Sequence, residues 1–150
     1  MGGRSRNSRK IVINSPLDIP YTMQKVQETA EKIRTMEIRG AGRIAKAAAE
    51  AIRDYAAGLD VASMEEFSAR IREVSNFLIS TRPTAVSLPN AVKLSSKYSS
   101  ANVKEARQEI IENANLFIER ADRALEKIGK IGARRIQDGD VIMTHCNSHA

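Results

Sequence analysis

Apolar side chains recur every three to four residues over most of the chain, and this period places them on one face of an α-helix. Four such faces can be followed along the sequence. We predict a mainly α-helical fold in which these faces meet in one core. Their apolar positions are Val26, Ala30 and Ile33; Ile44, Ala48, Ile52 and Tyr55; Phe67, Ile71, Val74 and Leu78; and Val103, Ala106, Ile110, Ala114, Phe117, Ala121, Leu125 and Ile128.

Polar residues at the predicted helix ends support this division. Ser63 with Glu66, and Asn102 with Glu105, have the spacing of a helix cap, in which a side chain accepts a hydrogen bond from a backbone N–H of the first turn. Gly58 is expected to end the second helix as a C-cap. These signals place helix boundaries near residues 58, 63 and 102.

Pairs of glycine or proline interrupt the pattern at three places. We expect Gly40 and Gly42 to separate two helices, and Pro83 and Pro89 to bracket a rigid connection to a short helix. Gly129 and Gly132 are expected to mark the weakening of the last helix.

The pattern changes at the carboxyl end. Residues 138–140, Asp-Gly-Asp, are typical of a turn, and the apolar run 141–143 predicts a buried strand. Cys146 would then follow the carboxyl end of a strand, which is where open α/β sheets place their chemistry. Because a strand needs a partner strand, we interpret the chain as the front part of a larger protein that continues into an α/β domain.

The composition indicates a globular protein with one core. Of the 150 residues, 42% are hydrophobic and 28% are charged. No apolar run approaches the length of a membrane span, and the amino terminus lacks the apolar segment of a secretory signal. A single cysteine excludes an internal disulfide and fits a reducing compartment. We therefore expect a cytoplasmic protein without a membrane partner.

The net charge of +6 overstates the charge of the folded part. Four of the 24 basic residues lie within residues 1–10, so the rest of the chain has 20 basic and 18 acidic residues. We interpret residues 1–21 as a basic leader. Aromatic residues make up only 4% of the chain, and none forms a stacking platform among the basic residues. Nucleic acid is therefore not an expected partner.

The segment Arg39-Gly40-Ala41-Gly42 is the first candidate binding site. Its glycines leave backbone amides open at the amino end of the following helix, where an anion can bind, and Arg39 adds a planar fork of donors suited to phosphate. A Gly-x-Gly sequence between helices is also typical of a tight turn without a ligand. From the residues alone, both interpretations remain open.

Arg82 is a second candidate cation. It precedes Pro83, which moves it out of helical conformation and leaves it exposed or paired with an anion. An ordinary surface salt bridge is the alternative.

Cys146 is the candidate for chemistry. Polar residues surround it in the sequence Thr-His-Cys-Asn-Ser-His at 144–149, and hydroxyl, amide and imidazole groups can stabilise a thiolate. A small buried hydrophobic residue is the alternative. A zinc site made by His145, Cys146 and His149 is disfavoured, because a structural site needs a further group of ligands. We expect no metal and no cofactor.

Three motifs in order, RGAG at 39–42, TRPTAVSLPNA at 81–91 and GDVIMTHCNSHA at 139–150, resemble one protein family. It contains the archaeal ribose-1,5-bisphosphate isomerases, the methylthioribose-1-phosphate isomerases and the regulatory subunits of translation initiation factor 2B. The resemblance covers residues 23–150. It implies an amino-terminal helical domain at 22–137, followed at 138–150 by the first strand of a truncated Rossmann-like α/β domain.

The resemblance also implies roles for residues. The cysteine equivalent to Cys146 is the base that takes the proton from C2 of the sugar, so that a cis-enediolate forms, and an aspartate later in the sheet domain returns a proton as acid. That aspartate and a pocket lysine lie beyond residue 150 in the family, so the 150-residue chain alone is expected to be inactive. The residues expected to contact the substrate are Arg39, Gly40, Ala41, Gly42, Arg82, Asn147, Ser148 and His149.

The expected activity is conversion of ribose 1,5-bisphosphate to ribulose 1,5-bisphosphate in nucleotide salvage. The expected partners are a phosphorylated pentose and further copies of the chain, as a dimer or a trimer of dimers. Arg43 and Ile44 after the RGAG motif, and His145 with His149, are closer to the bisphosphate enzymes than to the methylthioribose enzymes, which are the nearest catalytic alternative. A non-catalytic translation-factor subunit is the alternative from another functional class.

Overall fold

A computed structural model describes residues 21–143 of the chain. This part contains five α-helices and no strand, which confirms the mainly helical prediction. None of the helices in it has the length and apolar character that a membrane span requires. Predictions about residues 1–20 and 144–150 lie outside the described residues. The helices are α1 (Tyr21–Arg34), α2 (Ala41–Gly58), α3 (Met64–Ser80), α4 (Ser87–Ser95) and α5 (Val103–Ala133).

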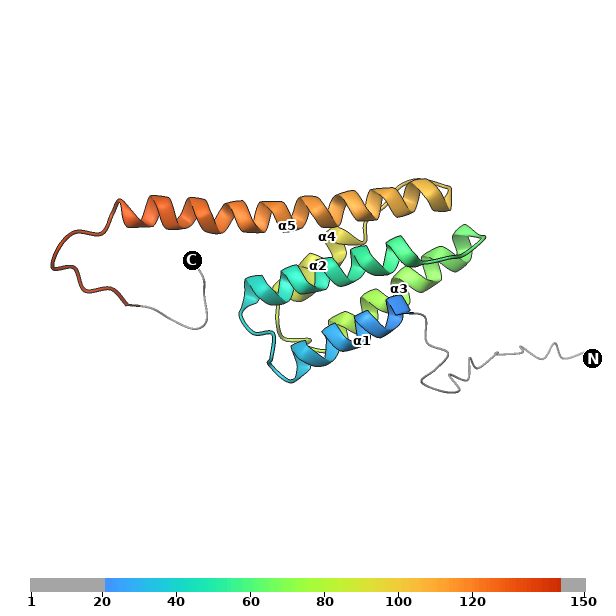
Figure 1. The fold of residues 1–150 in the computed structure, drawn as a ribbon, viewed down its shortest axis with the longest axis horizontal. Helices are drawn as coiled ribbons and strands as arrows, with labels where there is room; N and C mark the ends of the chain where they lie inside the picture. Colours follow the sequence, from blue (N-terminus) through green and yellow to red (C-terminus); the bar gives the residue numbers. More distant parts are fainter. Residues whose placement is uncertain (1–20, 144–150) are drawn as a thin grey trace, which may run out of the picture.

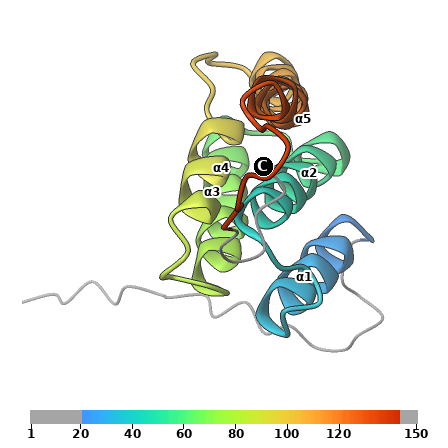
Figure 2. The same ribbon diagram turned by 90° about the vertical axis from the view of Figure 1, so that its left-hand side faces the viewer.

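Successive helices run back and forth, so that alternate connections meet at the same end of the bundle (Figure 1). The α1–α2 and α3–α4 connections lie at one end, and α5 also runs towards that end (Figures 1 and 2). The α2–α3 and α4–α5 connections lie at the other end. Two segments far apart in the sequence, 35–40 and 81–86, are therefore placed at one end, which we call the loop end.

Helix α2 is the centre of the fold, because it packs against each of the other four helices. Alanine makes this possible, since its small side chain lets neighbouring helices approach closely while larger residues fill the remaining space. Ile44 and Ile52 are fully buried between these alanines. The buried alanines of α2 are Ala45, Ala48, Ala49, Ala51 and Ala56.

The predicted apolar faces of α1, α2 and α3 are all buried, as are Ala106, Ile110 and Ala114 of α5. The prediction is wrong for the last part of the α5 face, where Leu125 is 37% and Ile128 is 48% exposed. The reason is geometric, because α5 is longer than its partners and extends past the loop end of α2 (Figure 1). Periodicity identifies a face, but it does not show how far the partner helices reach.

Both predicted helix caps are confirmed. The Ser63 hydroxyl accepts a hydrogen bond from the Glu66 N–H at 3.2 Å, and the Asn102 side-chain oxygen accepts one from the Glu105 N–H at 2.9 Å. Gly58 is not a left-handed C-cap but the last residue of α2. A Cβ atom at this position would collide with the methyl group of Thr22, so this glycine serves the close packing of α1 on α2.

The glycine and proline pairs require three corrections. Gly42 lies in the first turn of α2 rather than in the connection. Pro89 lies in the first turn of α4, where its missing N–H would have no helical partner in any case. Helix α5 continues through Gly129 and Gly132 to Ala133, since each glycine costs only about 1 kcal/mol and good helix formers surround both.

The turn at 138–140 is confirmed. Gly139 has φ 93°, the Asp140 N–H donates to the Gln137 carbonyl at 3.1 Å, and the Asp140 carboxylate accepts from the Gln137 N–H at 2.8 Å. The predicted buried strand at 141–143 is absent from the described residues, where Val141 is 98% and Met143 is 93% exposed. A strand forms only against a partner strand, and the described residues offer none.

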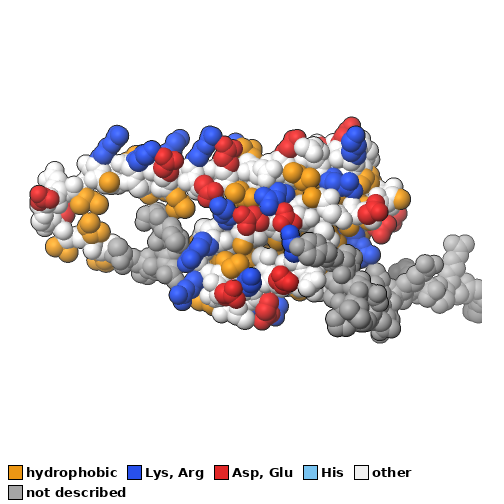
Figure 3. Space-filling model, viewed as in Figure 1, with side chains coloured by type: hydrophobic (Ala, Val, Ile, Leu, Met, Phe, Trp, Pro, Cys, Tyr) orange, Lys and Arg blue, Asp and Glu red, His pale blue; other side chains and the backbone are white. Residues whose placement is uncertain are grey.

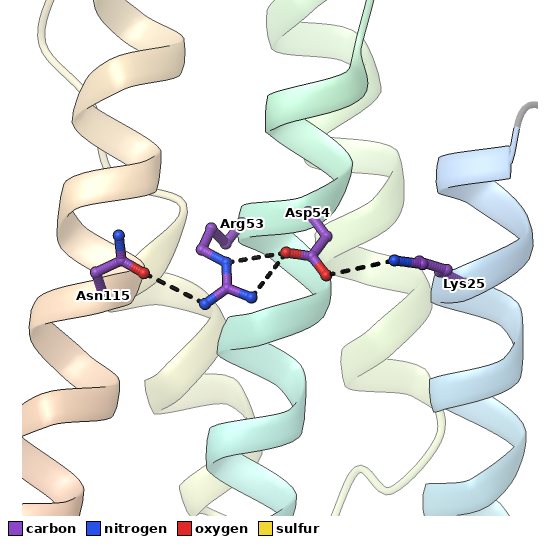
Figure 4. Close-up of polar contacts among 4 residues, drawn as sticks. All are labelled: Lys25, Arg53, Asp54 and Asn115. Atoms are coloured by element: carbon purple, nitrogen blue, oxygen red, sulfur yellow. Dashed lines mark hydrogen bonds and ion pairs between the residues drawn. The ribbon is translucent and has the colours of Figure 1, made fainter.

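Polar side chains connect three helices across one face of the bundle (Figure 4). Arg53 of α2 donates to Asn115 of α5 at 3.3 Å and to the adjacent Asp54 at 2.9 Å. The other oxygen of Asp54 lies 4.0 Å from the Lys25 ammonium of α1. These contacts are largely exposed, so they contribute less to stability than the apolar core beneath them.

The α4–α5 connection is held by one carboxylate. Glu109 accepts hydrogen bonds from the Ser99 N–H at 2.7 Å and the Ser100 N–H at 3.1 Å, and from both serine hydroxyls. Asn113 adds a hydrogen bond to the Lys97 carbonyl at 2.8 Å. The Ser100 hydroxyl, together with the other donors, lowers the pKa of Glu109 below its ordinary value.

We predict that Glu109→Gln lowers the melting temperature at neutral pH, because the amide lacks the charge and one of the two acceptor oxygens. A carboxylate whose pKa is lowered by folding stabilises the protein at pH values above its unfolded pKa, and this contribution is lost as the pH falls through the folded pKa. Thermal melts between about pH 7 and about pH 3 should therefore show a difference from wild type that shrinks in acid. Glu112→Gln is the control, since the Glu112 carboxylate accepts a hydrogen bond from exposed Gln108 and from no other residue within 21–143. A difference that is independent of pH would contradict this role.

Candidate anion-binding site

The connection between α1 and α2 is held in a defined shape by its backbone. Met36 has φ 64°, an unusual value for a residue with a side chain. The Ile38 N–H donates to the Lys32 carbonyl at 2.9 Å, which closes the turn after α1. Gly40 has φ 91° and ψ 134°, a conformation that residues with a Cβ rarely adopt. The predicted turn at Gly40 is therefore real and requires glycine.

The amino end of α2 has no side-chain cap. Gly40 occupies the N-cap position, and the first turn contains no acidic residue. The first N–H groups of a helix lack helical partners, and the helix dipole makes this end positive. In α2 the groups so exposed belong to Ala41, Gly42 and Arg43. Because a Cβ at Gly42 would meet no atom within 4 Å, the space beside this turn is open, and this end of α2 can bind an anion.

Two arginines accompany these amides. Arg39 is exposed, and its guanidinium makes no hydrogen bond or ion pair with another described residue. Arg43 folds back from the first turn of α2, and its Nε–H donates to the Arg39 carbonyl at 2.9 Å. Arg43 was not among the predicted site residues, because a bond from its side chain to a backbone carbonyl leaves no signal in the sequence.

Arg82 lies at the same end of the bundle, in the connection between α3 and α4 (Figure 2). Its backbone is fixed by two hydrogen bonds, from its N–H to the Ile79 carbonyl at 3.3 Å and from the Ala85 N–H to its carbonyl at 3.1 Å. Its half-buried guanidinium has no carboxylate partner within residues 21–143, so the alternative of a surface salt bridge finds no support there. Residues 74–104 contain no acidic residue at all.

Five of the predicted site residues thus lie on the two connections of the loop end, namely Arg39, Gly40, Ala41, Gly42 and Arg82. The predicted catalytic residue Cys146, with the predicted contacts Asn147, Ser148 and His149, lies outside the described residues. Helix α5 runs towards the loop end and extends past it, and residues 134–143 follow the end of this helix (Figure 1).

One ion pair joins α2 to the distal half of α5. The Lys46 ammonium lies 2.8 Å from Asp122, and the hydrogen bond to Asp122 raises the pKa of Lys46. In the space-filling view, basic and acidic side chains alternate along α5, and basic side chains also lie at the loop end of α2 (Figure 3). No sequence pattern connects Lys46 with Asp122, which lie 76 positions apart, so this pair could not be predicted.

Comparison with known proteins decides the family. The model of the initiation factor 2 subunit family matches residues 37–150. The chain belongs to this family. The matched region includes Arg39–Gly42, Arg82 and Cys146, which confirms the resemblance on which the site was predicted.

Individual members of the initiation factor 2 subunit family bear different names. A protein of Methanocaldococcus jannaschii named ribose 1,5-bisphosphate isomerase is 52% identical over 128 residues, 85% of this chain and 41% of that protein. One of Dehalococcoides mccartyi named methylthioribose-1-phosphate isomerase is 32% identical over 149 residues, 95% of this chain and 45% of that protein. The chain thus spans less than half the length of these curated relatives.

A solved structure supports the fold. The crystal structure of the translation initiation factor eIF-2B, subunit delta, from A. fulgidus is 31% identical, with a TM-score of 0.68 over 81% of this chain and 36% of that chain. The helical arrangement of this chain is therefore also found in that protein.

The two glycines of the site are predicted to respond differently to alanine. Gly40→Ala should lower stability by about 1–3 kcal/mol, because it forces a side chain into a positive φ. Gly42→Ala should leave stability equal or slightly higher, since its helical position has open space and alanine favours helix. Chemical unfolding of both variants checks this. Equal losses at both positions would show that the turn does not depend on the φ of Gly40.

Proposed function

We propose that this chain is the amino-terminal part of an aldose–ketose isomerase that converts ribose 1,5-bisphosphate to ribulose 1,5-bisphosphate. The observation that carries the proposal is the placement of the Arg39–Gly42 segment and Arg82 at one end of the bundle, with both guanidiniums free of protein partners within the described residues. The 52% identity to a protein named for this activity supports the same substrate.

Two cationic elements suit a sugar with a phosphate at each end. The open amides of Ala41, Gly42 and Arg43, together with Arg39, provide donors for one phosphate. Arg82 lies on a separate connection and provides a planar fork for the second. Asn147, Ser148 and His149 are assigned to further substrate contacts.

The reaction transfers hydrogen within one molecule. The C1–O4 bond of the ribose ring breaks and O4 gains a proton. C2 loses its carbon-bound proton, the C2 hydroxyl loses its proton, and C1 gains one, so that C1 is reduced while C2 is oxidised to the ketone. The sum is an isomerisation, and no external oxidant or reductant enters it. We assign the removal of the C2 proton to the Cys146 thiolate, because a thiolate is a base that can operate near neutral pH. The acid that completes the reaction is assigned to the part of the protein beyond residue 150.

Two alternatives have specific support. The 32% identity to a methylthioribose-1-phosphate isomerase favours a substrate with a single phosphate, for which one cationic element would suffice. The likeness to a translation initiation factor subunit favours a binding protein without chemistry, which would require neither a free Arg39 nor a cysteine base. For the isomerase we further propose a cytoplasmic location, a role in nucleotide salvage, and assembly as a dimer or a trimer of dimers.

The arginines provide one test in the intact isomerase. Arg39→Ala and Arg82→Ala should each raise KM for ribose 1,5-bisphosphate, through loss of charge-assisted bonds that are typically worth about 1.5–3 kcal/mol. Arg72→Ala is the matched control, because Arg72 is an exposed arginine of α3 without a partner in the described residues. Both sugar phosphates should be assayed with each variant. If Arg82→Ala leaves KM unchanged for both substrates, Arg82 binds no phosphate.

Cys146→Ser provides the test of the chemistry. The serine hydroxyl retains the size of the group but ionises too weakly to remove a carbon-bound proton, so turnover should be abolished while substrate binding is retained. Calorimetry measures binding, and exchange of the C2 hydrogen with deuterium from solvent measures proton removal. A variant that exchanges and isomerises at the wild-type rate would exclude Cys146 as the base. An intact wild-type protein that turns over neither substrate would favour the translation-factor subunit.

A further inference from the structure

Arg43 occupies a position that helix stability does not explain. It is the third residue of α2 and therefore lies at the positive end of the helix dipole, where a cation is unfavourable and an acidic residue is preferred. No carboxylate among the described residues pairs with it. Within residues 21–143, the one hydrogen bond of its side chain is the donation of its Nε–H to the Arg39 carbonyl at 2.9 Å.

The Arg39 carbonyl belongs to the peptide that joins Arg39 to Gly40. Because a peptide is planar, holding its carbonyl also fixes the direction of the Gly40 N–H. Gly40 has φ 91°, a region in which glycine adopts several backbone conformations at low cost. The contact from Arg43 therefore restrains the one residue of the turn whose own backbone is least restrained.

The contact also leaves donors available. The guanidinium of Arg43 uses its Nε–H for the Arg39 carbonyl, and its two terminal nitrogens bond to no other described residue. A guanidinium holds these donors in one rigid plane, so a single side chain can hold the turn and face an anion together. The ammonium of lysine is a single point of charge, so it cannot hold the turn and face an anion with the same geometry.

We infer that Arg43 is a positioning residue for the phosphate of the substrate. It holds the peptide between Arg39 and Gly40, and so keeps the amides of the turn and the amino end of α2 directed at one phosphate. This inference rests on the proposed function, which places a sugar phosphate at the same turn. Arg43 would then affect phosphate binding through the shape of that turn.

The first experiment separates binding from catalysis in the intact isomerase. Arg43→Ala should raise KM for ribose 1,5-bisphosphate by about tenfold, because the turn that binds the phosphate loses one charge-assisted hydrogen bond, with kcat within about twofold of wild type. The KM of Arg43→Lys should be raised to a similar extent, because lysine restores the charge but not the planar fork of donors. Arg72→Ala is the control and should change neither constant.

Three results would overturn the inference. An unchanged KM in Arg43→Ala would show that Arg43 is an ordinary surface cation. Full recovery of KM in Arg43→Lys would show that charge alone is needed. A fall in kcat together with a lowered melting temperature would show a general role in folding, because a positioning role predicts a change confined to KM.

A second experiment does not depend on turnover. Inorganic phosphate is titrated into the 150-residue chain while the amide chemical shifts of residues 40–43 are followed by NMR. Wild type should show saturable shifts, and Arg43→Ala should bind phosphate severalfold more weakly. If the wild-type amides respond but the intact protein isomerises neither sugar phosphate, the proposed function fails while the role of Arg43 stands. Equal phosphate binding by wild type and Arg43→Ala removes that role.

Discussion

The close packing of the alanine-rich helix α2 against its four partners is the constraint on which the rest of the structure depends. Five buried alanines let the other helices approach, and Ile44 and Ile52 fill the spaces that remain. Close packing also requires a small residue at Gly58, where even a methyl group would collide with Thr22 of α1. Because α2 is fixed on several sides, its amino end is a rigid platform, and the turn at Gly40 is built on it.

Much of the fold follows from the sequence, because local chemistry determined it. The caps at Ser63 and Asn102 depend on residues three apart, and the buried faces of α1 to α3 depend on helical spacing. The errors arise where a distant part of the molecule decides. Leu125 and Ile128 continue a perfect apolar face, yet the helices that could cover them end earlier. The run 141–143 has strand character, but no partner strand exists in the described residues.

The sequence predicted the residues of the candidate site, but not how they are placed relative to one another. The Arg39–Gly42 segment and Arg82 were recognisable from their residues and from the family motifs, but the sequence did not show that they share one end of the bundle. That placement follows from the alternating directions of four helices (Figure 1). The contact from Arg43 to the Arg39 carbonyl depends on a side-chain conformation, which no motif specifies. The site at Cys146 remains a prediction, since it lies outside the described residues.

The electrostatics of the loop end favour a ligand over a purely structural role. Cations at the amino end of a helix typically cost about 0.3–1 kcal/mol, and α2 begins with Arg39 before it and Arg43 within its first turn. Some cations elsewhere in the described residues have a carboxylate partner, as Lys46 has in Asp122 and Arg70 has in Glu73, whereas Arg39 and Arg43 have none there. An acidic first turn, such as Glu65 and Glu66 provide in α3, would remove the cost. A bound phosphate would remove it too, because its charge is opposite to both the arginines and the helix end. The first turns of α1 and α4 also lack an acidic residue, so what distinguishes the amino end of α2 is its two arginines, whose charge a bound phosphate would balance.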